Sequence, residues 1–191
     1  MNKINYLKDI NINFNNIKRL TLEYKKDNKD RDAKSKIKNN FETLFSFSNI
    51  ENNLIYLDIK FIDYEINNEL FENINNFKIL KNLYLENFNF HKNFTIKLNE
   101  LKLLSIIFCK NIKISEVYNK NEKISKLNLS YNRNLDIKIL EEVYFKELKE
   151  LNLSNNEISD INILEKANFK VLKELDLSNN EISNIIRKSR F

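Results

Sequence analysis

Apolar residues recur along this chain in a short unit, with one at position 1, one at position 4 and one at position 6. The unit is clearest near the C-terminus, where residues 148–159 return 24 residues later as residues 172–183. The two segments differ only in that Asn152 is replaced by Asp176. A repeat period between roughly 20 and 50 residues is typical of a solenoid. The pattern therefore predicts a stack of similar structural units.

The same unit can be followed upstream at intervals of 21 to 37 residues. Seven copies start at Ile17, Leu54, Leu80, Leu101, Ile124, Leu148 and Leu172. In each copy the apolar positions 4 and 6 alternate with mostly polar ones, as a β-strand with one buried face requires. A single unit cannot bury its own apolar face, so neighbouring units must stack. We expect one strand per copy and a parallel sheet.

Position 9 of the unit is occupied by a set of residues that we call the ladder: Cys109, Asn132, Asn156 and Asn180. With them four of the seven copies fit the pattern L-x-x-L-x-L-x-x-N/C-x-L, whereas the first three fit only its apolar positions, and the chain resembles the leucine-rich repeat family. The resemblance implies an α/β solenoid of about seven repeats, with a curved parallel sheet on the concave face and short helices and loops on the convex face. It also implies that the ladder points inward and bonds backbone amides where the strands end. Asn suits this role because its amide both donates and accepts hydrogen bonds.

The chain length of 191 residues favours a single domain over residues 1–191. Its repeats are irregular over residues 1–100, with a charged insertion at residues 25–39, and regular over residues 101–191. An apolar residue also stands three positions before five of the repeats, at Phe14, Phe77, Leu98, Phe145 and Phe169. We expect these residues to form an apolar spine on the convex side. Gly and Pro are absent, so Asn is expected to take the left-handed turn positions.

The resemblance places positions 3, 5, 7 and 8 on the concave side, where proteins of this family commonly hold their partners. The middle of that surface is predicted to be rich in aromatic and aliphatic residues, which are Tyr56, Phe61, Tyr84, Leu103, Ile107, Phe108 and Tyr131. Apolar side chains gathered on a solvated strand face indicate a partner-binding patch. The alternative is that position 8 packs against loops and that Leu103, Ile107 and Phe108 belong to an irregular core.

The net charge of +5 raises the question of a nucleic-acid partner. Residues 25–39 carry seven Lys or Arg against three Asp, and residues 187–190 add three further cations. The rest of the chain therefore has a net charge of −2, which argues against a continuous basic groove for a phosphate backbone. The insertion is interpreted as a solvated loop, or alternatively as a docking element for an acidic partner or nucleic acid.

The residue types needed for catalysis or metal binding are scarce. The absence of Gly excludes a Gly-rich phosphate loop. His91 and Cys109 are the only residues of their types, so they cannot build a Cys/His metal site, and an intramolecular disulfide is excluded. Cys109 is interpreted as a buried structural thiol. We predict no catalytic residues, no cofactor and no metal, and hence a protein that is not an enzyme.

The two chain ends carry the remaining expectations. Residues 1–10 lack the apolar stretch of a secretory signal, and no apolar run is long enough to span a membrane, so a cytoplasmic location is expected. Residues 181–191 are too few for another repeat. Three interpretations of this end stay open. A small cap is formed by Ile185, Ile186 and Phe191 folding back, or the chain is a piece of a larger leucine-rich repeat regulatory protein, or it dimerises through the open edge of its last predicted strand. The function expected is a scaffold or adaptor, monomeric in the first instance, that binds a protein partner.

Overall fold

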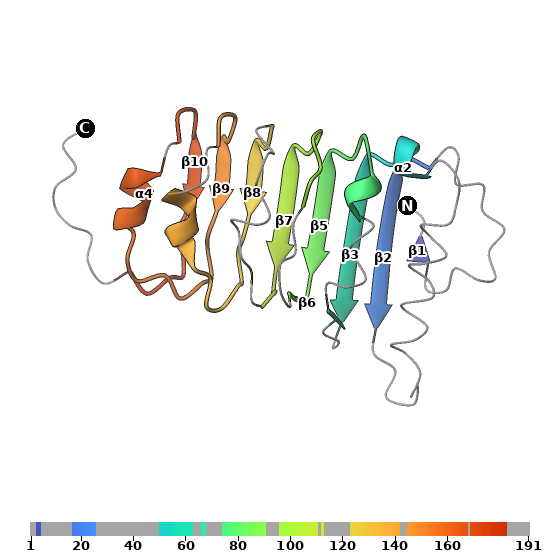
Figure 1. Cartoon of the computed structure of the whole chain (residues 1–191). Coiled ribbons are helices and arrows are strands. Elements are labelled where there is room, and N and C mark those ends of the chain that lie inside the picture. Colours follow the sequence, from blue (N-terminus) through green and yellow to red (C-terminus); the bar gives the residue numbers. More distant parts are fainter. Residues whose placement is uncertain are drawn as a thin grey trace.

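In a computed structural model the chain forms a solenoid with one parallel β-sheet along its length (Figure 1). The structure describes residues 3–4, 17–25, 50–62, 66–67, 74–90, 96–110, 112, 123–141, 145–167 and 169–182. Over these ranges the sheet has eight strands in the order β1-β2-β3-β5-β7-β8-β9-β10. Their bounds, in that order, are Lys3–Ile4, Arg19–Lys25, Tyr56–Ile62, Asn82–Glu86, Leu103–Ile107, Lys126–Asn128, Glu150–Asn152 and Glu174–Asp176.

The seven strands from β2 to β10 are the ones that the repeat pattern predicts, and they follow one another in the predicted order. The position-4 residues are paired from strand to strand, as Leu20, Leu57, Leu83, Leu104, Leu127, Leu151 and Leu175. A slip of one residue would turn every buried side chain to the other face of the sheet, so burial of the leucines fixes this register. The additional strand, β1, pairs in parallel with β2 and precedes the predicted units.

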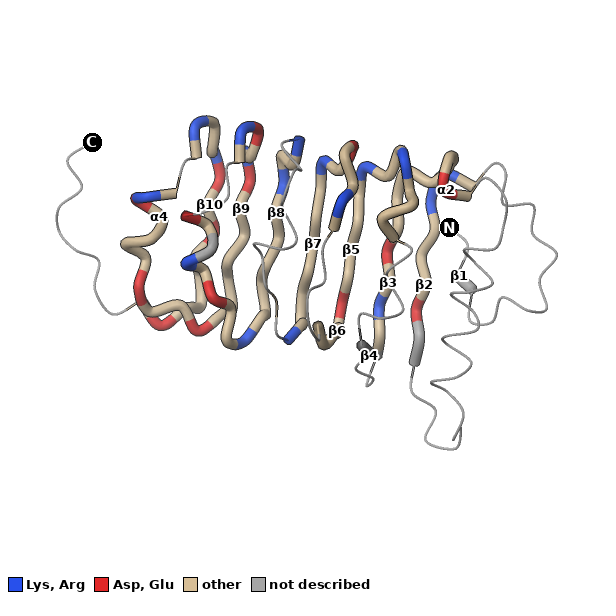
Figure 2. Tube along the Cα trace, in the orientation of Figure 1, with Lys and Arg blue, Asp and Glu red and all other residues tan. Residues whose placement is uncertain are grey.

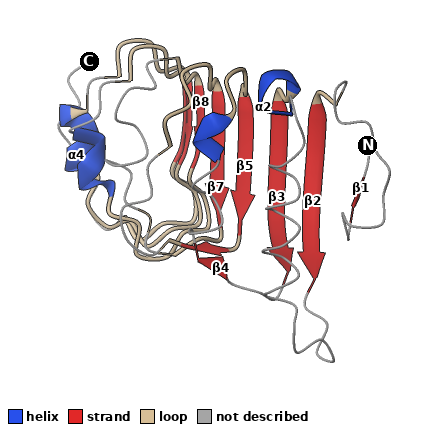
Figure 3. Ribbon diagram, turned by 45° about the vertical axis from the view of Figure 1, so that its right-hand side comes forward, coloured by secondary structure: helices blue, strands red, loops and turns tan. Residues whose placement is uncertain are grey.

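Short helical segments and loops complete the turns of the solenoid, and α4 lies across the interior from the sheet (Figure 3). The helical segments include α2 (Ile50–Asn53), the 3₁₀ helix η3 (Ile137–Glu141) and α4 (Asn162–Lys166), and residues 74–76 form a further 3₁₀ turn. A small second sheet pairs β4 (Ile66–Asn67) with β6 (Phe88–Asn89). The predicted α/β solenoid, with a parallel sheet on one side, is confirmed.

The apolar core lies between the sheet and the opposite wall. Positions 4 and 6 are buried in each strand from β2 to β9. Burying one such Leu or Ile contributes roughly 1.5–3 kcal/mol, so the contacts between neighbouring turns hold the stack together. At β10, the last strand of the described sheet, Leu175 is 43% exposed.

The predicted spine forms the other side of the core. Phe77, Leu98 and Phe145 are buried. Phe169 is partly buried, with its ring centroid 6.1 Å from that of Phe145. The spine is thus confirmed at these four positions, whereas Phe14 lies outside the described residues.

The ladder connects each turn to the next through buried hydrogen bonds. The backbone N–H of Cys109 donates to the Oδ1 of Asn132 at 2.7 Å. The Nδ2 of Asn132 donates to the carbonyls of Ile106 at 2.7 Å and Leu129 at 2.8 Å. Asn156 makes the same three bonds one turn later. Each amide therefore satisfies one backbone donor and two acceptors that the strand ends leave unpaired.

Cys109 takes the ladder position with weaker sulfur bonds. Its Sγ donates to the carbonyl of Ile107 at 3.1 Å and accepts from the backbone N–H of Phe88 at 3.2 Å. Burial raises the pKa of this thiol to about 12. A thiol that stays protonated at neutral pH is a poor nucleophile, which agrees with a structural role.

The repeat of β5 has Phe88 at the ladder position, and it satisfies its turn differently. The Phe88 ring is buried in the core, 4.8 Å from the ring of Phe61. The neighbouring Asn87 donates from its Nδ2 to the carbonyl of Phe61 instead. The β4–β6 pairing adds backbone bonds at the same place. One residue thus fills the core and its neighbour supplies the amide.

Several predicted features lie outside the described residues. These are residues 26–39 of the insertion, His91, the basic residues at 187–190, and the cap candidates Ile185, Ile186 and Phe191. In the described part of the chain, no helix is long and apolar enough to cross a lipid bilayer.

Candidate functional site

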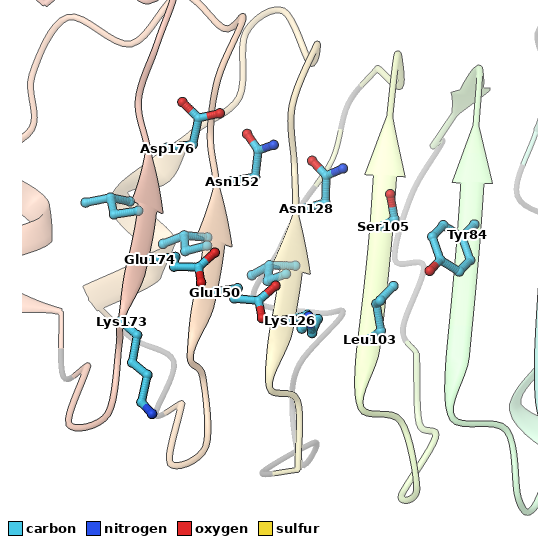
Figure 4. Close-up of a pocket in the computed structure, with 13 residues that line it drawn as sticks. Tyr84, Leu103, Ser105, Lys126, Asn128, Glu150, Asn152, Lys173, Glu174 and Asp176 are labelled. Carbon is cyan, nitrogen blue, oxygen red and sulfur yellow. Dashed lines mark ion pairs between the residues drawn. The ribbon is translucent and has the colours of Figure 1, made fainter.

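One face of the sheet points away from the core and carries the side chains at positions 3, 5 and 7 of the units; we call it the open face. Figure 4 shows side chains of β5 to β10 that project from this face. They line an open hollow of about 630 Å³. Because its floor is a broad sheet, it suits a polypeptide segment better than an enclosed small molecule.

The N-terminal part of the open face carries a stacked group of three side chains. The guanidinium carbon of Arg19 lies 4.2 Å from the ring centroid of Tyr56. The rings of Tyr56 and Tyr84 are 5.0 Å apart at an interplanar angle of 37°. Burial, and then the charge of Asp58, raise the pKa of both tyrosines, so both phenols are neutral and can donate hydrogen bonds.

The centre of the open face is the strand β7. Leu103 and Ile107 are half-buried here, and neither belongs to the core cluster nor packs against it. Ser105, between them, is only 3% exposed and is paired with Tyr84 on β5. A small recessed side chain flanked by larger apolar ones makes a shallow depression that a partner side chain can fill.

Phe108 and Tyr131 form an exposed aromatic pair where β7 and β8 end. Their ring centroids are 4.6 Å apart and the rings are stacked at 26°. Phe108 is 46% exposed and Tyr131 is 45% exposed. Together with neighbouring polar residues they line a second open groove of about 550 Å³. The pair adjoins Ile107, so it continues the apolar surface of β7.

The backbone at this pair is in a conformation that aromatic residues disfavour. The φ angle is 53° at Phe108 and 60° at Tyr131. At the same position of three other units the residue is Asn, which is Asn87, Asn155 and Asn179, also with positive φ. A left-handed conformation costs a bulky residue roughly 1–2 kcal/mol, whereas Asn tolerates it. The prediction that Asn replaces Gly at the turns is thereby confirmed, and the two aromatic residues are the exceptions.

Phe61 is not on the open face, and the prediction of its location is wrong. Its side chain is completely buried in the core. Position 8 points outward only where the chain turns left-handed, as at Phe108. Phe61 lies within β3, which runs on to Ile62, and strand alternation therefore turns its side chain inward.

The other predicted residues divide into two neighbouring groups. Tyr56, Tyr84, Leu103 and Ile107 are half-buried on the open face, and Phe108 and Tyr131 lie at the edge where β7 and β8 end. Tyr24 on β2 occupies position 8 of its unit, as Phe108 and Tyr131 do, but its side chain lies outside the described set.

Sequence reasoning missed the charge of the open face. Across positions 3, 5 and 7 of the seven strands, three cations stand against six carboxylates, a net charge of −3 on a chain whose net charge is +5. The cations are Arg19, Lys60 and Lys126, and the carboxylates are Glu23, Asp58, Glu86, Glu150, Glu174 and Asp176. Figure 2 shows that acidic and basic positions are spread along the length of the sheet. The signal was present in the sequence but becomes visible only when charge is summed by repeat position.

The described residues contain no group of three or more His, Cys, Asp or Glu side chains that could hold a metal ion. Cys109 is buried. His91, the only histidine of the chain, lies outside the described residues. What the described surface offers is apolar contact, hydrogen bonding and charge, which are the elements of binding.

Comparisons with known proteins agree with the repeat register. Residues 146–188 match the family model of leucine-rich repeats in two copies. Among solved structures, an internalin from Listeria monocytogenes has a similar fold, with a TM-score of 0.55 and 23% sequence identity. The match covers 86% of this chain and 49% of the internalin chain, so this chain spans about half of its length. Curated protein sequences gave no significant match. The register and the ladder agree with these two matches: residues 146–188 carry two leucine-rich repeats, and most of the chain has a fold similar to that of the internalin.

Proposed function

We propose that this protein is a non-catalytic interaction scaffold that binds a protein partner on its open face. The patch that would make the contact comprises Tyr56, Tyr84, Leu103, Ile107, Phe108 and Tyr131. Leucine-rich repeat folds commonly serve as interaction scaffolds, which supports the general role. The choice of this face and these residues is our proposal.

The observation that carries the proposal is the exposed, stacked pair of Phe108 and Tyr131. The pair lowers the stability of the fold in two ways. Its backbone adopts a left-handed conformation that aromatic residues disfavour, and its apolar rings remain exposed to water. The two rings contact each other, but both lie outside the core cluster, so packing in the core does not offset these costs. Residues that break a local rule without a compensating gain in stability are characteristic of functional sites. Partner binding would bury the rings and recover part of the cost.

The test is affinity capture of protein partners by the wild type and by a variant carrying Phe108→Asn and Tyr131→Asn. Asn is the chain's own residue at this position in three other repeats, so the variant is expected to fold. We expect a partner retained by the wild type to be lost by the variant. Thermal unfolding of the variant should occur at the wild-type temperature or above it.

The matched control is Glu165→Gln, an exposed position on α4, away from the open face. It should retain every partner that the wild type retains. If the folded aromatic variant captures the same proteins as the wild type, the patch is not the binding site. If the variant unfolds more easily than the wild type, the aromatic pair is structural and the argument from strain fails.

Other expectations from the sequence stay predictions. Docking of an acidic partner or a nucleic acid through residues 25–39 concerns residues beyond the described ranges. A role as part of a larger leucine-rich repeat regulatory protein is compatible with the length of the internalin chain. The monomeric state, the alternative dimer through β10 and the cytoplasmic location await measurement.

A further inference from the structure

A second feature of the sheet is the edge at which its strands begin, where the backbone bonding repeats from unit to unit. At position 2 the carbonyl accepts from two N–H groups of the next unit, at its positions 2 and 3. The carbonyl of Lys149, for example, accepts from the N–H of Lys173 at 2.8 Å and of Glu174 at 3.0 Å. All six junctions between the seven units have this pair of bonds. Position 2 is therefore a continuous row in which neighbours lie one strand spacing apart.

Most residues of this row are lysines, which we call the lysine row: Lys18, Lys81, Lys102, Lys149 and Lys173. The other two residues at position 2 are Ile55 and Ser125. All five lysines are exposed, and within the part of the chain that the structure describes none of them forms an ion pair with a carboxylate. Lys173 also borders the hollow of the open face, and in Figure 4 its side chain extends past the start of β10. Figure 2 shows basic positions along this edge, above β5, β7, β9 and β10.

The residues on either side of the lysine row do not neutralise it. The three residues before each unit, together with its position 3, carry six cations and six carboxylates over the seven units. The cations are Arg19, Lys78, Lys123, Lys126, Lys146 and Lys170, and the carboxylates are Glu51, Glu100, Glu122, Glu147, Glu150 and Glu174. Position 1 carries no charge, so the net charge of this edge is the +5 of the lysine row.

The row places like charges next to one another. The backbones of Lys81 and Lys102 are bonded directly, as are those of Lys149 and Lys173. Like charges directly opposite on neighbouring strands destabilise a sheet. The pKa of Glu100 is lowered chiefly by Lys123, which is 2.6 Å from it, and less by the charges of Lys81 and Lys102. The nearby carboxylate is thus engaged elsewhere, and an added anion would relieve the repulsion within the row.

We infer that the lysine row is a second interaction surface and that it binds an extended acidic polypeptide segment, rich in Asp and Glu, which runs across the strands. None of its residues belongs to the patch on the open face, so the inference is independent of the proposed function. Complementary charge selects an acidic occupant, because the row and its flanks together have an excess of cations.

Two observations favour a polypeptide over a nucleic acid. The row is one residue wide and has carboxylates on both sides, with Glu100 and Glu147 before it and Glu150 and Glu174 after it. The phosphates of a DNA duplex, at roughly one charge per 1.7 Å of its axis, would meet these carboxylates as well as the lysines. Single-stranded nucleic acids are held by aromatic rings beside the cations, and the two residues before each unit and its first two include no Phe or Tyr.

The dimensions of the row set the length of the segment. From Lys18 to Lys173 there are six strand intervals. At roughly 4.8 Å each they give about 29 Å, which about nine extended residues would cross. Contacts are expected to be strongest at the two pairs of adjacent lysines, where the density of positive charge is highest.

The experiment is a titration of the full chain into a fluorescently labelled glutamate peptide about ten residues long, followed by fluorescence anisotropy at low and high salt. The test variant is Lys149→Gln with Lys173→Gln. The matched control is Lys138→Gln with Lys166→Gln, which removes two exposed lysines on η3 and α4. Both variants lose the same charge, and circular dichroism checks that both are folded. At low salt the test variant should bind about fivefold more weakly than the wild type and the control within about twofold, and added salt should narrow the difference.

The outcomes decide between the row and a general effect of charge. Weaker binding by the test variant alone supports the inference. Equal losses in both variants, or no binding of the peptide at low salt, would overturn it. Tighter binding of an oligothymidine, or of vesicles of phosphatidylserine and phosphatidylcholine, than of the peptide would also overturn it.

A further variant keeps this test separate from that of the proposed function. Phe108→Asn with Tyr131→Asn should bind the glutamate peptide as the wild type does, because it leaves the lysine row unchanged. Loss of peptide binding in this variant would place the peptide on the open face and overturn the inference. Capture of the protein partner and binding of the acidic peptide can therefore fail independently.

Discussion

Replacing the ladder residue Asn132 by Asp tests how the fold is held together, since the two side chains have nearly the same shape. The Nδ2 of Asn132 donates to the carbonyls of Ile106 and Leu129. An Asp carboxylate at this position has no donor, so its oxygen would face the two carbonyl oxygens and both hydrogen bonds would be lost. It would also be a buried negative charge without a paired cation. The side chain of Asn132 is 1% exposed, so solvent cannot compensate.

The magnitude follows from these contacts. A buried polar group left without its partner costs about 1–3 kcal/mol, and breaking a buried charge pair costs about 3–5 kcal/mol. We expect Asn132→Asp to lower the free energy of unfolding by about 3–5 kcal/mol at pH 7. The introduced carboxyl would have a raised pKa in the folded state. Its neutral form can donate one hydrogen bond, so the loss should shrink as the pH falls.

The chain provides a matched control at Asn152. There the Oδ1 accepts from the backbone N–H of Ser154 at 2.9 Å and from its hydroxyl at 2.7 Å. One repeat later Asp176 makes the same two bonds, at the same two distances, to Ser178. Because only the acceptor oxygen is used, Asn152→Asp should change the stability by less than about 1 kcal/mol.

The assay is urea unfolding of both variants at pH 7 and pH 5, followed by circular dichroism. The expected result is a large loss for Asn132→Asp at pH 7, a smaller loss at pH 5, and little change for Asn152→Asp at either pH. Equal stability of the two variants at pH 7 would refute the hydrogen-bond account of the ladder.

Three further outcomes follow from the same structure. Phe108→Asn should raise the stability by about 1 kcal/mol, because Asn tolerates the left-handed φ of 53°; a fall in the unfolding temperature would contradict the strain argument. Asp58→Asn should be more stable than the wild type at pH 7, because the pKa of Asp58 is raised in the folded state and the wild type therefore loses stability as the pH rises through that folded-state pKa. Below the ordinary pKa of 3.8 the Asp58 carboxyl is protonated in both states, so the stability gain of the variant should vanish there. A gain that persists below this pH would contradict the electrostatic origin. Cys109, with its pKa raised to about 12, should resist alkylation at pH 8 until the protein is unfolded, and rapid labelling of the native protein would exclude the buried thiol.

The sheet could be predicted from the sequence because its register depends on one repeated feature. Leucines at position 4 from Leu20 to Leu175 must face the same side, and this requirement fixes the order and pairing of seven strands. The strand β1 precedes the repeat units, and the β4–β6 pair forms after the strands β3 and β5, at positions for which the units share no common pattern. They were therefore missed.

The side-chain directions at position 8 could not be predicted from spacing alone. Phe61 and Phe108 occupy the same position of the unit, yet one is completely buried and the other is 46% exposed. The difference lies in the backbone, which stays extended at Phe61 and turns left-handed at Phe108. An aromatic residue gives little indication of a left-handed turn, since it disfavours that conformation.

The charge of the open face required the register before it could be seen. Counted along the chain, the residues other than 25–39 and the C-terminal tail have a net charge of only −2. Counted by repeat position, positions 3, 5 and 7 of the seven strands hold six carboxylates and three cations. The fold, and not the composition, therefore determines what a partner would meet.

The measurement that tests the central claim most directly is hydroxyl-radical footprinting of the protein with and without a saturating amount of a partner captured by the wild type. We predict that Tyr84, Leu103, Phe108 and Tyr131 become protected when this partner binds. Leu164, Phe169 and Val171, none of which occupies position 3, 5, 7 or 8 of a unit, should be labelled equally in both states. Protection of this second group with unchanged labelling of the first would contradict the open face as the binding surface.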